Sequence, residues 1–194
     1  MTRTAIVLLA ATALAACSKG ESANTVDAPA APAPINMAGM SGMMMGEKFK
    51  AAQTAGQSFI NSAAAADAFE LTAARMALTA WRSPQVKTFA AAMIAAHAAS
   101  AAKLKTVMAG MHPPMTPELH FTKAQQAMLD GLKGKTGAAF DAAYAAAEVA
   151  SHQNTVGGLT YFSQNGNDWP ELKQYAGAWL PTEAEHLRMA KGLK

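Results

Sequence analysis

Residues 140–162 read FDAAYAAAEVASHQNTVGGLTYF, and this stretch has the clearest helical pattern in the chain. Its large apolar residues recur at helical spacing: Phe140, Tyr144, Leu159 and Phe162. Glu148 and His152 are four residues apart and therefore share that face. The alternation of apolar and polar residues that is typical of strands is absent. We expect a helix over residues 138–164 in an all-α protein.

Alanine-rich segments on either side predict three further long helices and one short helix. The expected helices cover residues 58–81, 84–108, 121–132 and 138–164, and the last runs from after Asp168 to Lys191. Pro181 leaves the Gly177 carbonyl without its helical partner, so a kink is expected there. Four long helices, with a short extra helix in the crossover between the second and third, predict a ferritin-like four-helix bundle.

The chain begins with the pattern of a lipoprotein signal peptide over residues 1–16. Arg3 precedes an uncharged run from Thr4 to Ala16 that is too short to span a bilayer. The run ends in Leu14-Ala15-Ala16-Cys17, which looks like the lipobox of bacterial lipoproteins, so we expect lipidation at Cys17. By resemblance to sorted lipoproteins, Ser18 favours the outer membrane. The expected location is the periplasmic side of that membrane, with the lipid as the only membrane anchor.

The amino-acid composition divides the chain after the signal peptide into a tether and a folded domain. Residues 17–46 are rich in Ala, Pro and Met, which predicts a disordered, lipid-anchored tether before a bundle over residues 47–194.

Cys17 is the only cysteine in the sequence, so disulfides and thiolate metal sites are excluded. Once Arg3 is removed with the signal, 15 basic and 13 acidic residues remain, and nucleic acid is not an expected partner.

Each predicted long helix places Glu or His on its apolar face. These residues are Glu70, His97, Glu148, His152, Glu183 and His186. Such groups are costly to bury unless they are paired or bound to a metal. Carboxylates and imidazoles from facing helices are the ligands of di-iron and di-manganese bundles. The alternatives are a structural His–Glu hydrogen-bond network, or helix faces that are only half buried.

The pattern resembles a bacterial ferritin-like domain-of-unknown-function family, commonly labelled predicted outer membrane proteins. The resemblance covers about Phe59 to Ala190, and its carriers are Phe59, Glu70, Val86, Phe89, Ala90, His97, Phe140, Asp141, Tyr144, His152, Leu180, Pro181 and His186. It implies a periplasmic or membrane-anchored bundle without an established activity. Ala96 stands where members often have an acidic residue, and Ile94 replaces the Glu of the ferritin Glu-x-x-His pair. A mononuclear or degenerate site therefore fits better than a complete di-iron centre.

Methionines cluster in two places. The tether contains Met37, Met40, Met43, Met44 and Met45. A second group, Met111 and Met115 with His112, stands in the crossover just after Met108, which lies on the apolar face of its helix, and this group is also not expected to be core packing. Thioethers select Cu(I), so the tether predicts weak copper capture. Low-complexity drift, or a surface where methionine is oxidised reversibly, are the alternatives.

The leading hypothesis is a metal-handling or envelope-stress protein that holds copper, iron or manganese. No nucleophile elbow, phosphate loop or dinucleotide motif occurs, so no catalytic residue is expected. A metal-free module that binds an envelope protein is the main alternative. A redox enzyme acting on peroxide or oxygen is a third, and the incomplete ferritin pattern argues against it. Convergence of three or more of the six Glu and His side chains within ligand distance of one point favours the metal, whereas side chains that point to separate places favour the interaction module.

Overall fold

The computed structural model describes residues 37–194, with side chains from Thr54 onward. These residues form α1 (Met37–Ala80), α2 (Pro84–Gly110), α3 (Lys123–Leu132), α4 (Gly137–Asn165) and α5 (Pro170–Ala190), and no strand is found among them. The prediction of an all-α bundle with a short extra helix in the crossover is therefore confirmed. The signal peptide, Cys17 and tether residues 17–36 lie outside the described residues.

The predicted boundaries of α2 to α5 agree with the structure to within a few residues, whereas α1 begins much earlier. Its helix starts at Met37 and includes residues 37–46, which the sequence pattern assigned to the tether. That part of the tether prediction is corrected. The physical reason is that no proline occurs between Pro34 and Pro84, and Met, Ala, Lys and Glu all favour helix enough to offset the interspersed glycines.

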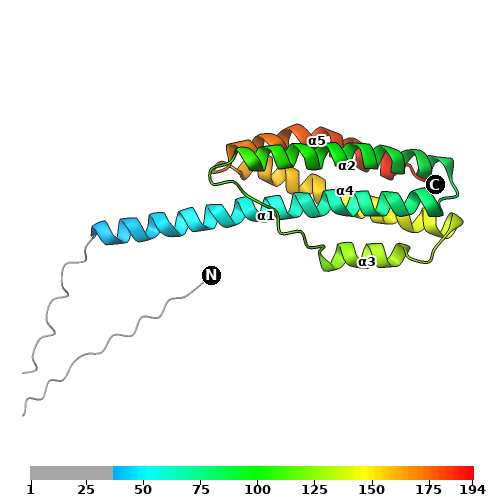
Figure 1. Cartoon of the computed structure of the whole chain (residues 1–194), viewed down its shortest axis with the longest axis horizontal. Coiled ribbons are helices and arrows are strands. Elements are labelled where there is room, and N and C mark those ends of the chain that lie inside the picture. The colour runs from blue at the N-terminus through cyan, green and yellow to red at the C-terminus, as the bar shows by residue number, and fades with distance from the viewer. Residues whose placement is uncertain (1–36) are drawn as a thin grey trace, which may run out of the picture. The chain divides into compact units, whose positions relative to one another are not determined.

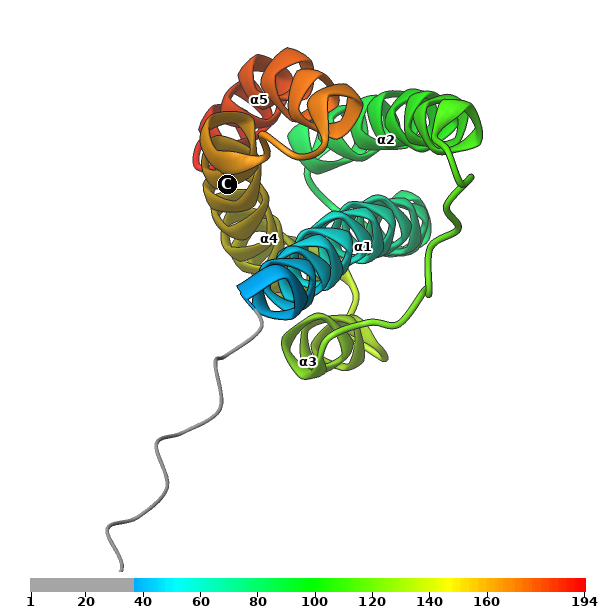
Figure 2. The same ribbon diagram turned by 90° about the vertical axis from the view of Figure 1, so that its left-hand side faces the viewer.

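The four long helices pack side by side, and α3 lies outside them (Figures 1 and 2). Viewed from the end, α5 and α2 lie together on one side, and α3 lies beyond α1 on the other (Figure 2). The crossover from α2 to α3 runs down the flank of the bundle (Figure 2). No helix in the described part of the chain is both long and apolar enough to cross a membrane.

The interior contains two apolar clusters separated along the helices. The first includes Phe69, Phe89, Met93, Phe140 and Tyr144, and the second includes Ile60, Leu104, Leu159, Phe162 and Leu172. In α2, α4 and α5, the Glu and His residues named above fall between the segments that contribute to the two clusters, and in α1 Glu70 falls where the first cluster begins. The six buried Glu and His residues therefore form a layer between the two apolar clusters, which we call the polar layer.

Asp141 near the start of α4 joins that helix to the segment before α2. Its carboxylate accepts hydrogen bonds from the backbone N–H groups of Arg82, at 3.1 and 3.2 Å, and Ser83, at 2.7 Å. The side chain of Ser83, the residue just before α2, makes no capping hydrogen bond. The contact with Asp141 therefore fixes the turn between α1 and α2 against α4.

Candidate metal centre

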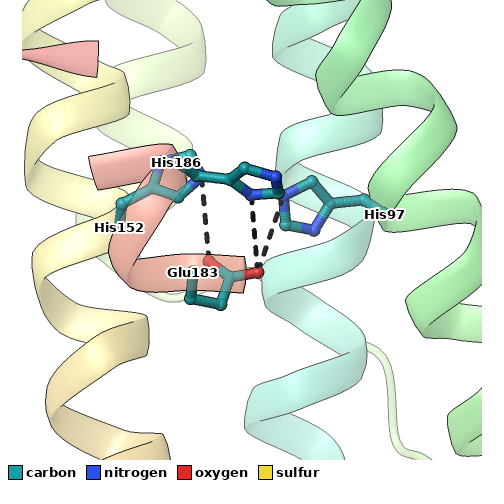
Figure 3. Close-up of side chains that lie close together, drawn as sticks. All are labelled: His97, His152, Glu183 and His186. Atoms are coloured by element: carbon teal, nitrogen blue, oxygen red, sulfur yellow. Dashed lines mark ion pairs between the residues drawn. The ribbon is translucent and has the colours of Figure 1, made fainter. Parts of the chain in front are cut away.

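The polar layer brings together all six Glu and His residues that the sequence singled out. All are buried, and they form two sets that share one histidine. We call His97, His152, Glu183 and His186 the His-rich group (Figure 3), and Glu70, Glu148 and the shared His152 the carboxylate group. Within each group, one ligand atom from every residue lies within 4.8 Å of the others.

The His-rich group surrounds the carboxylate of Glu183. Its oxygens lie 3.8 Å from His97 Nε2, 3.7 Å from His152 Nε2 and 3.9 Å from His186 Nδ1. Figure 3 shows the three rings, from α2, α4 and α5, turned toward this carboxylate. Ligands held at ~2.0–2.2 Å in a tetrahedral site are roughly 3.3–3.6 Å apart. The ligand atoms of the His-rich group lie within 4.8 Å of one another, so they would have to approach by up to about 1 Å to hold one ion.

Hydrogen bonds hold two of the imidazoles in one orientation. His97 Nδ1 lies 3.0 Å from Asp67 Oδ1, and His152 Nδ1 lies 2.8 Å from the backbone carbonyl oxygen of Glu148. Because both partners are oxygen acceptors, each Nδ1 carries a proton, and in the neutral form of each ring Nε2 keeps its lone pair for an ion. This is how metal-binding histidines are oriented: one nitrogen is held by an acceptor and the other faces the ion.

Several ligand atoms in the layer have no hydrogen-bond partner. They include His97 Nε2, His152 Nε2, His186 Nδ1 and Glu183 Oε2, and all four belong to the His-rich group. Leaving a buried polar group unsatisfied costs about 1–3 kcal/mol or more, so native structures rarely do so without a reason. A structural His–Glu network would satisfy these atoms with one another. The observed orientation instead directs them at a common point.

The carboxylate group has a different chemistry. Ser151 Oγ donates to Glu70 Oε1 at 2.6 Å, while neither oxygen of Glu148 has a hydrogen-bond partner. His152 Nδ1 lies 3.5 Å from Glu148 Oε2 but is already committed to the backbone. This half of the layer therefore offers carboxylate oxygens alone. Burial and the nearby charge of Glu70 raise the pKa of Glu148 well above its usual value, which favours the neutral acid.

The ionisable groups of the His-rich group also have shifted pKa values. Burial raises the pKa of Glu183, against the opposing effect of His97 and His152. Burial, together with the neighbouring His97 and His152, lowers the pKa of His186 to about 4. For His97, burial acts to lower the pKa, but the hydrogen bond that the ring donates to Asp67 and the carboxylates of Glu70 and Glu183 outweigh it and raise the pKa. A bound divalent cation would favour ionised carboxylate and neutral imidazole together.

Three supporting residues were missed by sequence reasoning. Asp67 holds His97, Ser151 holds Glu70, and Trp179 Nε1 donates to Glu183 Oε1 at 2.8 Å. Each had a weak signal, because each lies on a predicted ligand face or beside a predicted ligand: Asp67 three residues before Glu70, Ser151 next to His152, and Trp179 four residues before Glu183. Spacing alone does not distinguish such a residue from ordinary helix surface.

The methionine predictions have different outcomes. Met37, Met40, Met43, Met44 and Met45 lie in the first turns of α1, and their side chains are outside the described residues. Met108 and Met111 are buried in the second apolar cluster, and Met115 packs against it. The expectation that this second methionine group is not core packing is therefore wrong, because the crossover folds back onto the end of the bundle.

Comparisons with known proteins agree with this architecture. The sequence profile of the family described as "Domain of unknown function (DUF4142)" matches residues 44–193. No curated protein matches the chain. A solved structure described as "CopM in the Cu(II)-bound form" is similar in fold, with a TM-score of 0.58 and 20% sequence identity over 70% of this chain and 93% of that one. At this level of identity the similarity shows the fold alone.

Proposed function

This chain belongs to the DUF4142 family, and we propose that its His-rich group binds one divalent transition metal ion, with copper as the favoured ion. The observation that carries the proposal is the set of four buried, unpartnered ligand atoms, contributed by α2, α4 and α5. Their orientation is held before any ion arrives, since Asp67 and the Glu148 carbonyl hold two of the three rings. Such preorganisation lowers the free-energy cost of binding.

The donor set narrows the choice of ion. Three imidazole nitrogens and one carboxylate oxygen suit Cu(II), Zn(II), Ni(II) and Fe(II) better than the hard cations Mg²⁺ and Ca²⁺. Within the first-row series, a site of nitrogen and oxygen ligands binds Cu(II) most tightly. The fold similarity to a protein described as Cu(II)-bound supports the same choice.

In the cell, we propose a ferritin-like, lipid-anchored domain on the periplasmic side of the outer membrane that handles metal in the envelope. Cys17 would carry the lipid, and the tether methionines would capture Cu(I) for the bundle. Cu(I) affinity should then fall when Met37, Met40, Met43, Met44 and Met45 are all replaced by Leu. Unchanged affinity would restrict copper binding to the bundle and remove this part of the proposal.

The central test is metal content, measured by mass spectrometry on protein purified without chelating resin and then offered Cu(II), Zn(II), Fe(II) or Mn(II) separately. We expect one equivalent of Cu(II), with nitrogen hyperfine structure in its electron paramagnetic resonance spectrum. His152→Ala should abolish that signal. His112→Ala is the matched control, because His112 is an exposed histidine outside the His-rich group.

The result that overturns the proposal is equally direct. If the wild-type protein retains none of the four ions, or retains copper just as well after His152→Ala, the His-rich group is not a metal site. The protein would then be better described as a module that binds an envelope partner. Circular dichroism of each variant separates loss of the site from loss of the fold.

A further inference from the structure

A cavity of about 620 Å³ lies against the proposed metal centre. Its walls come from α1, the crossover, α3, α4 and α5, with His97 and Ser100 contributed by α2. Asp67, His97 and Glu183 form part of its lining, so the inner end of the cavity meets the His-rich group directly. All three residues are at most 4% exposed, and each retains a buried side-chain atom without a hydrogen-bond partner.

The lining of the cavity offers a cation acidic side chains and oxygen atoms. It includes the carboxylates of Asp67, Glu118 and Glu183, and neither Lys nor Arg is found among the described residues that line it. Hydroxyl and amide side chains supply further oxygen atoms along the walls: Ser58, Asn61, Ser62, Ser100, Ser151 and Asn154. An acidic cleft with low-dielectric walls concentrates cations and repels anions.

The outer rim of the cavity is formed by Glu118 and His120, both exposed on the crossover. Two side chains of α1 hold this segment in place. The Asn61 Oδ1 atom accepts the backbone N–H of Glu118 at 2.8 Å, and Gln57 Nε2 donates to the Thr116 carbonyl oxygen at 2.8 Å. The crossover is therefore attached across the flank of α1, with a carboxylate and an imidazole at the mouth.

We infer that this cavity is the path by which the metal cation reaches the His-rich group, with Glu118 and His120 as its first contacts. The inference rests on the proposed function, because it concerns access to the same site. His97 and His152 are 1% and 0% exposed, so neither ring lies open on the outer surface of the bundle. The cavity joins His97 and Glu183 to the exposed rim, and its oxygen atoms can replace part of the hydration shell on the way.

The test blocks the cavity without touching a ligand. Gly158 lines the cavity, whereas its neighbour Gly157 does not. Both are exposed, and a Cβ added at either position meets no atom within 4 Å. We expect Gly158→Phe to slow Co(II) uptake by on the order of tenfold in stopped-flow absorbance, and Gly157→Phe to leave the rate unchanged. Cobalt is used because the tether thioethers bind it poorly.

A second pair of variants tests whether negative charge at the rim of the cavity speeds metal uptake. Glu118→Gln removes a rim carboxylate, and Glu171→Gln removes an exposed carboxylate outside the cavity. We expect the first to slow uptake roughly threefold at low salt and to weaken its dependence on ionic strength. Glu171→Gln should change neither the rate of uptake nor its dependence on ionic strength. Metal content at equilibrium should remain one equivalent in all four variants, because no ligand has been altered.

The outcomes separate the access path from the site. Uptake at the same rate in Gly158→Phe and Gly157→Phe, with full metal content in both, would overturn the path and leave the proposed function intact. Absence of bound Co(II) and Cu(II) in the wild-type protein would overturn both. Slower uptake only in the variants that alter the cavity would support both.

Discussion

The two halves of the polar layer contain similar residues but differ in what they offer an ion. In the His-rich group, three imidazole nitrogens and a carboxylate face one point, and two rings are held by hydrogen bonds. In the carboxylate group, the nitrogen of His152 that faces Glu148 is already bonded to the backbone, and burial favours the protonated form of Glu148. Residue type alone does not decide whether a cluster of Glu and His binds a metal ion. The cluster must also present free lone pairs, and each residue must be in the protonation state that leaves its lone pair free.

Glutamate substitutions in the two halves should have very different effects on metal affinity, and this is the largest effect we expect. Glu183→Gln removes the only carboxylate of the His-rich group and should lower Cu(II) affinity roughly 100-fold. Glu148→Gln should change it by less than about threefold, because the amide resembles the neutral acid. Competition titrations with a chelator measure both. Equal losses would mean that the two halves bind metal as one dinuclear site.

The second-largest effect concerns the residues that orient the ligands. Asp67→Asn weakens the acceptor that holds His97 and should lower Cu(II) affinity about 10- to 100-fold without changing the one-to-one stoichiometry. Ser151→Ala removes the corresponding hydrogen bond to Glu70 in the carboxylate group and serves as the control. Isothermal titration calorimetry at a fixed pH compares the Cu(II) affinities of the two variants. A larger effect from Ser151→Ala would reverse the roles assigned to the two halves.

In the metal-free protein, Glu148→Gln should increase stability at alkaline pH. The pKa of Glu148 is raised above 4.5 in the folded state, so the folded protein binds a proton that the unfolded chain has lost, and stability falls as pH rises. Glutamine carries no ionisable group, so the variant avoids the loss of stability that comes with a buried, ionised Glu148. We expect a gain of about 1–3 kcal/mol near pH 8 that shrinks toward pH 5, measured by urea unfolding. A constant gain at every pH would contradict a protonated Glu148.

His186 should have the opposite and smaller pH dependence. Its pKa is lowered from 6.5 to about 4, so the unfolded chain takes up a proton in this interval while the folded protein does not. Stability of the metal-free protein should therefore be lost as pH falls from about 6.5 toward 4, by about 1–2 kcal/mol. His186→Gln should remove this slope, and thermal unfolding between those pH values measures it. A slope that survives the substitution would have to come from another group.

Much of the bundle could be predicted from local patterns. Helices α2 to α5 were found because apolar residues recur at helical spacing and because Pro84, Pro113 and Gly166 interrupt the pattern. The start of α1 was missed because glycine and methionine in a biased segment were interpreted as disorder, although the stretch contains no helix breaker as strong as proline. Composition was the wrong guide in this stretch, where apolar periodicity was absent and the helix propensity of the residues was overlooked.

The candidate site was predictable to a similar extent. The six Glu and His residues were identified because each interrupts an apolar face, where an ionisable group needs a partner. Asp67 was not identified, since its role depends on a contact between α1 and α2, and Trp179 was not, since spacing alone does not show that its indole N–H bonds to Glu183. Met111 was misassigned because the return of the crossover onto the bundle leaves no periodic signal.

The sequence by itself determined the helical class and the six residues that occupy the polar layer, because helical spacing and the cost of burial act along the chain. Only the tertiary structure decided which nitrogen each histidine presents, which carboxylates are left without a partner, and where a cavity reaches them. The physical reason is that hydrogen bonds of 2.6–3.0 Å between residues as far apart as Glu70 and Ser151 depend on how the helices dock. Those contacts divide similar residues into a group suited to a metal ion and a group that favours a proton.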